Sequence, residues 1–122
     1  GDNMVFILSK DEQVIRALSQ RCSMKRLRSF AVTSVAKLTK LMKVVQVTTV
    51  LIDSEIAKGW HPKAKQDSKL NGILKDSRTD GIAIVGKIAL KNLPNGVSML
   101  PLDDFKMLES FLEKANWLKI GT

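Results

Sequence analysis

The sequence has one cysteine, one histidine and no long hydrophobic segment. Cys22 has no second thiol with which to form an internal disulfide, which agrees with a reducing compartment, so we expect a cytoplasmic protein. His61 is the lone histidine, which excludes a metal site built from several histidines. The longest apolar runs, such as residues 47–52 and 82–85, are far shorter than the roughly 18 residues that suggest a transmembrane helix. We therefore expect no membrane insertion.

The length and composition of the chain suit one domain. A chain of 122 residues, 44% of them hydrophobic, is long enough for one shared core and too short for two typical domains. We interpret residues 1–3 as a cloning remnant and residues 4–122 as the domain. No positive charge precedes the short apolar run at residues 4–8, so the beginning of the sequence is unlike a signal peptide.

Positive charge is abundant and unevenly placed. The formal net charge is +8, which favours an acidic partner, namely a nucleic acid, an anionic membrane surface or an acidic protein surface. Residues 24–43 contain no Asp or Glu and carry a basic patch formed by Lys25, Arg26, Arg28, Lys37, Lys40 and Lys43. We favour the interpretation that these side chains solvate exposed helix faces, and a nucleic-acid site remains the alternative.

The hydrophobic pattern predicts five strands, at residues 4–8, 29–33, 47–52, 82–85 and 97–100, separated by helical segments. Ser9 and Glu12 have the spacing of a capping box, which predicts the start of the first helix. Cys22 falls on the apolar face of that helix, where we expect a small buried hydrophobe. A weaker pattern at residues 70–74 permits another helix, and Asp103 is predicted to cap the last one.

Strands that alternate with helices are typical of a parallel sheet with helices on both faces. We predict an α/β fold of the flavodoxin-like doubly wound class, with a five-stranded sheet in the order 2-1-3-4-5. In such folds the functional groups gather at the carboxyl ends of the strands.

Two segments carry a resemblance to a known family. The run Val50, Leu51, Ile52, Asp53 resembles the third strand of receiver domains of bacterial two-component response regulators, which ends in the aspartate that accepts phosphate. The run from Leu100 through Pro101 to Phe105 is similar to the junction of the last strand and last helix in that family. The resemblance extends in element order from Met4 to about residue 118, and it implies that Asp53 occupies the phospho-acceptor position.

The departures from the family concern the phosphorylation chemistry. Receivers place two acidic Mg²⁺ ligands after the first strand, where this chain has Ser9 and Lys10, although Asp11 lies nearby. The family's Ser or Thr after the fourth strand corresponds to Gly86, and its lysine before the proline corresponds to Leu100. We therefore expect no catalytic residues, no metal ligands and a degenerate pocket, with these members: Ser9, Lys10, Asp11, Asp53, Gly86, Lys87, Leu100 and Pro101.

Two interpretations of Asp53 remain open at this point. Lys10 can replace the metal and form an ion pair with Asp53, because both residues follow neighbouring strands. Alternatively, Asp53 only caps the loop that follows its strand.

Three functions follow from these observations. The first is a pseudo-receiver, a signalling domain that acts by protein-protein interaction without phosphorylation, without cofactor and without enzymatic activity, on a protein partner or an attached output domain. The second is an active receiver that a histidine kinase phosphorylates at Asp53, with Mg²⁺ held by Asp11 or Glu55. The third is a nucleic-acid-binding regulatory module that uses the basic patch. A homodimer is compatible with each of them.

Overall fold

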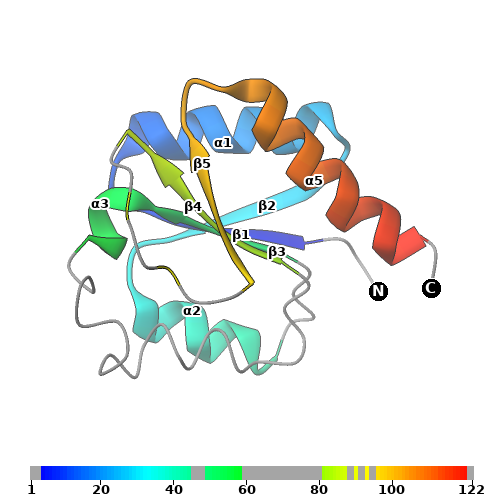
Figure 1. The fold of residues 1–122 in the computed structure, drawn as a ribbon. Coiled ribbons are helices and arrows are strands. Elements are labelled where there is room, and N and C mark those ends of the chain that lie inside the picture. The colour runs from blue at the N-terminus through cyan, green and yellow to red at the C-terminus, as the bar shows by residue number, and fades with distance from the viewer. Residues whose placement is uncertain are drawn as a thin grey trace.

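The sheet of the computed structural model has the predicted topology. The structure describes residues 4–44, 49–58, 81–87, 90, 93 and 96–120, with side chains up to residue 114. Its five strands are all parallel and lie in the order β2-β1-β3-β4-β5 (Figure 1). They are β1 (Met4–Leu8), β2 (Arg28–Val32), β3 (Thr49–Asp53), β4 (Gly81–Gly86) and β5 (Val97–Pro101). The flavodoxin-like α/β fold is thereby confirmed.

Helices cover both faces of this sheet. Helices α1 (Glu12–Met24) and α5 (Phe105–Ile120) lie on one side, and α2 (Val35–Met42) lies on the other (Figure 1). The short helix α3 (Ser54–Ala57) follows β3 directly and contributes Ala57 to the core on the α2 side. This arrangement makes a three-layer domain in which the central strands are buried on both faces.

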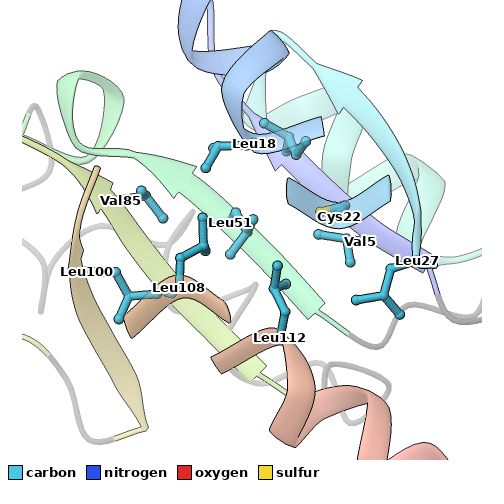
Figure 2. Close-up of a cluster of buried hydrophobic side chains, with 11 residues drawn as sticks. Val5, Leu18, Cys22, Leu27, Leu51, Val85, Leu100, Leu108 and Leu112 are labelled. Carbon is cyan, nitrogen blue, oxygen red and sulfur yellow. The ribbon is translucent and has the colours of Figure 1, made fainter. Parts of the chain in front are cut away.

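The alternation of side chains along each strand divides the core into two clusters. Val5 and Ile7 of β1 face α1 and α5, whereas Phe6 and Leu8 face α2. Figure 2 shows the first cluster, in which Cys22 lies among aliphatic side chains from the sheet and from α5. Cys22 is fully buried, and this burial raises the pKa of its thiol to about 12. The prediction of a small buried hydrophobe is confirmed.

The predicted helix starts need correction. Ser9 does not cap α1, because the N-cap is Asp11, whose side chain accepts a hydrogen bond from the backbone N–H of Gln13. The last helix likewise begins beyond Asp103, and it is Asp104 that accepts a hydrogen bond from the N–H of Met107. In both cases a carboxylate immediately before the helix takes the capping role, because it accepts from an otherwise unpaired N–H.

The first strand has the expected bounds, and the bounds of the other four differ from the expected ones by at most two residues. Asp53, Gly86 and Pro101 are as a result the last residues of their strands. The expected helix over residues 70–74, His61 and residues 1–3 lie outside the described residues. Within the part of the chain that the structure describes, no helix is both long enough and apolar enough to cross a membrane.

Candidate functional site

The carboxyl edge of the sheet brings Ser9 and Asp53 together. Strands β1 and β3 are neighbours in register, with Leu8 opposite Ile52, so the residues that follow them meet at one edge. The Ser9 hydroxyl donates a hydrogen bond of 2.6 Å to Oδ2 of Asp53. Ser9 is fully buried and Asp53 is 3% exposed. This pair is the polar centre of the candidate site.

Each remaining hydrogen-bonding atom of the pair also has a partner. The Ser9 oxygen accepts from the backbone N–H of Asp11 at 3.0 Å, which connects the pair to the start of α1. Oδ1 of Asp53 accepts from the backbone N–H of Glu55 at 3.0 Å and makes Asp53 the N-cap of α3. Both carboxylate oxygens are therefore held inside the protein, as expected of a buried polar group. Asp53 is thus a cap, as one of the two interpretations predicts, but it caps helix α3 and not only a loop, and it also accepts the hydrogen bond from Ser9.

The alternative ion pair between Lys10 and Asp53 is wrong. Lys10 is exposed, and no ion pair joins it to Asp53. The inward position after β1 belongs to Ser9, and Lys10, one residue later, lies in water. A neutral hydroxyl also costs less free energy to bury than an ammonium group does, so Ser9 satisfies the carboxylate at a smaller desolvation cost.

Gly86 is constrained by Ser54, a residue that the sequence analysis did not single out. Ser54 is 2% exposed, and its hydroxyl lies 1.9 Å from where a Cβ atom at position 86 would be. A side chain at position 86 would therefore collide with Ser54. The Ser54 hydroxyl fills the space into which the receiver-like serine or threonine at position 86 would project. Only the position of Ser54 directly after Asp53 could have drawn attention to it.

The other predicted pocket residues do not join this buried group. Leu100 is 5% exposed and packs in the cluster beneath α1 and α5, so it is a core residue (Figure 2). Lys10, Asp11, Lys87 and Pro101 are exposed. The buried site thus consists of Ser9, Asp53, Ser54 and Gly86, which come from the ends of three adjacent strands and the start of α3.

The oxygen atoms near Asp53 are poorly suited to Mg²⁺. A hard divalent cation takes about six oxygen ligands, and carboxylates supply most of the charge. The carboxylate of Asp11 caps α1, and that of Glu55 forms an ion pair with Lys58. No group of three or more His, Cys, Asp or Glu side chains able to hold a metal ion occurs among the residues that the structure describes. The side chains that remain around Asp53, those of Ser9 and Ser54, carry neutral hydroxyl groups.

The basic patch is divided by the fold. Lys25, at the end of α1, forms an ion pair with Glu113 of α5, which raises the lysine's pKa through that hydrogen bond. Lys37 and Lys40 belong to α2 and Lys43 caps its end, on the opposite side of the sheet (Figure 1). Arg26 and Arg28 lie between these groups, at the start of the edge strand β2. The patch therefore surrounds one edge of the sheet and does not occupy a single helix face.

Comparison with known proteins shows the fold and not the family. No family model matches the chain, and no curated protein matches it. The chain is similar to a fragment described as a "putative lipoprotein" from Peptoclostridium difficile 630, whose crystal structure aligns with a TM-score of 0.59 and 10% sequence identity. The alignment covers 94% of this chain and 98% of the other. At this identity the likeness supports the α/β architecture alone.

Proposed function

We propose that this chain is a pseudo-receiver, a bacterial signalling domain of the response-regulator type that works by protein-protein interaction and is neither phosphorylated nor catalytic. The observation that carries the proposal is the state of Asp53. Its two carboxylate oxygens accept hydrogen bonds from Ser9 and from the N–H of Glu55, and the side chain is 3% exposed. An acceptor carboxylate must instead present an oxygen to the incoming phosphoryl group.

The charge around Asp53 supports the same conclusion. Phosphoryl transfer depends on neutralising the negative charge of the transferred group, mainly through metal ions and cationic side chains. Ser9, Ser54 and Gly86 carry no charge, and Leu100 stands where the resemblance expects a lysine. The partner in this proposal is another cytoplasmic protein or an attached output domain.

A phosphorylation assay tests the proposal. We expect incubation with acetyl phosphate and millimolar Mg²⁺ to leave the intact mass unchanged, and beryllofluoride with Mg²⁺ to leave the amide resonances of residues 53–58 in place. An Asp53→Asn variant is the control for modification at any other residue. A phosphoryl adduct that appears in the parent protein and is absent from Asp53→Asn would establish the active receiver and overturn the proposal.

A further inference from the structure

The strand β2 forms an open edge of the sheet, since β1 is its one neighbour in the strand order. The backbone N–H of Ser9 donates to the carbonyl of Val32 at 3.1 Å, so Val32 directs its backbone groups toward β1. Successive residues of a strand direct these groups to alternate sides. Ser29 and Ala31 therefore present their N–H and C=O groups to the open side, where the described residues provide no further strand.

The open edge formed by β2 carries exposed apolar side chains. Phe30 remains 51% exposed although its ring packs edge-on against Phe6, with the ring centroids 6.0 Å apart. Ala31, the next residue, is exposed as well. An unpaired strand beside an exposed aromatic ring is a template for another strand, which natural proteins usually protect.

The opposite edge of the sheet has such protection. Leu102 donates its N–H to the carbonyl of Gly86, so in β5 the residue before it, Pro101, faces the open side. Proline has no N–H to offer to an added strand and commonly ends pairing at an edge. β2 contains no proline. The two edges therefore differ at their carboxyl ends, because Pro101 closes the last outward position of β5 whereas both outward positions of β2 keep their N–H groups.

Charge identifies what kind of strand the edge would accept. No Asp or Glu occurs between Glu12 and Asp53, and this segment contains eight Lys and Arg residues. It supplies β2 together with α1 and α2, the helices on either side of it (Figure 1). The glutamates of α5 pair with Arg21 and Lys25. Other cations stay exposed, namely Arg26, which shortly precedes β2, and Lys37, Lys40 and Lys43 of α2 and its C-cap, and α2 packs against β1 and β2. Two copies of this edge would repel each other, whereas an acidic strand would be attracted.

We infer that the β2 edge binds an acidic protein segment in an extended conformation, which adds to the sheet beside β2 and packs an apolar side chain against Phe30. Backbone hydrogen bonds to Ser29 and Ala31 supply the attachment, and the surrounding cations select for acidic sequence. This inference rests on the proposed function, because it assigns the binding surface of the proposed interaction domain.

The test uses a capped synthetic peptide of about seven residues in which a central Val is flanked on both sides by Glu, a length sufficient to pair with the whole of β2. Glu side chains then lie on both faces of the added strand, including the face that Phe30 shares with α2. We expect the peptide to bind the whole chain with a salt-dependent affinity and to shift the amide resonances of Ser29 and Ala31 downfield. The Ala31→Pro variant removes one outward N–H and should weaken binding about tenfold, which corresponds to about 1.4 kcal/mol. Lys37→Glu should also weaken binding, whereas Lys114→Glu, the same charge change on α5, should not.

Two further peptides test the inference without the Ala31→Pro variant, in case that variant does not fold. The same peptide carrying an N-methyl group on every residue should lose binding to the unaltered protein, because neither of its edges can donate hydrogen bonds to β2. A peptide with Lys in place of Glu should not bind. Equal binding of the N-methylated peptide, or a failure of the acidic peptide to shift Ser29 and Ala31, would overturn the inference.

Binding of DNA or of a second copy of the chain at the β2 edge would give different results in these experiments. Duplex DNA that displaces the peptide and shifts the α2 lysines while leaving Ser29 and Ala31 unchanged would assign the surface to nucleic acid. A concentration-dependent dimer that Ala31→Pro abolishes would make a second copy the occupant. Either result overturns the inference. Phosphorylation of Asp53 in the separate assay would overturn the proposed function but would leave peptide binding at β2 standing, so the two failures are distinguishable.

Discussion

The hydroxyl of Ser9 and the carboxylate of Asp53 form a buried hydrogen bond of 2.6 Å that joins the ends of β1 and β3. In the receiver-like interpretation both positions belong to phosphorylation chemistry, and here each stabilises the other. Asp53 gains a donor for one oxygen, and Ser9 holds the loop between β1 and α1 through the N–H of Asp11. Contacts within the domain therefore occupy the polar groups at the carboxyl ends of β1 and β3.

Removing the Ser9 hydroxyl should destabilise the protein. In Ser9→Ala, Oδ2 of Asp53 stays buried without its donor, so we expect the free energy of unfolding to fall by about 1–3 kcal/mol. Urea unfolding monitored by circular dichroism measures this change. Ser98→Ala, which removes an exposed hydroxyl from β5, is the matched control and should alter stability by less than about 0.5 kcal/mol. Equal stabilities of Ser9→Ala and the parent protein would contradict the importance of the bond.

Substitutions at Gly86 and Ser54 should compensate for each other in their effect on stability. Gly86→Ser places a Cβ atom against the Ser54 side chain, so we expect a loss of about 1–3 kcal/mol from overpacking. Ser54→Gly removes both the hydroxyl and the Cβ atom with which the new side chain collides. The double variant should therefore be more stable than the sum of the two single changes predicts. Additive free energies of unfolding in this double-mutant cycle would mean that the two residues do not compete for the same space.

Arg26 has the one positive φ among non-glycine residues of the described chain, at 58°. Leu27 and Arg26 donate their N–H groups to the carbonyls of Cys22 and Ser23, the two hydrogen bonds of a Schellman motif that ends α1. Glycine adopts this left-handed conformation without a Cβ clash, so Arg26→Gly should raise the free energy of unfolding by about 1 kcal/mol. Arg26→Ala removes the same charge but keeps the Cβ atom, and it should not produce the gain. Equal effects of the two variants would attribute the change to charge.

The fold was predictable because the three central strands β1, β3 and β4 have a strong local pattern. Residues 4–8 and 82–85 are continuously apolar, as expected of strands buried on both faces, and the parallel order follows from helices between them. The doubly wound topology therefore depends on the average hydrophobicity of each segment and on the order of the segments. Shifts of one or two residues at strand ends do not affect it.

The site depends on single residues and was only partly predictable. Ser9, Asp53 and Gly86 were expected to meet because they follow adjacent parallel strands. Which of two consecutive residues turns inward after β1 was decided by backbone direction, so Ser9 took the place assigned to Lys10. The role of Ser54 depends on an interatomic approach to Gly86 that no sequence pattern encodes.

Cys22 should make stability depend on pH in the alkaline range. Burial raises the pKa of its thiol from 9.0 to about 12, so between these values the unfolded chain loses the proton while the folded protein keeps it. The thiol's contribution to stability is fully present below pH 9.0 and is lost as the pH rises toward 12. The slope of this loss is about 1.4 kcal/mol per pH unit. Lysines also titrate here, so the informative quantity is the difference between the parent protein and Cys22→Ala.

That difference should be constant up to about pH 8.5 and should then decrease as the unfolded thiol ionises. Urea unfolding of both proteins at several pH values between about 8 and 10.5 measures it. The same burial predicts that a thiol reagent modifies native Cys22 no faster than the protein unfolds, and that urea exposes the thiol at the unfolding transition. Rapid modification of the native protein, or a stability difference that stays constant through pH 10.5, would show that the thiol is accessible to water and that the packing between α1, α5 and the sheet is looser than Figure 2 shows.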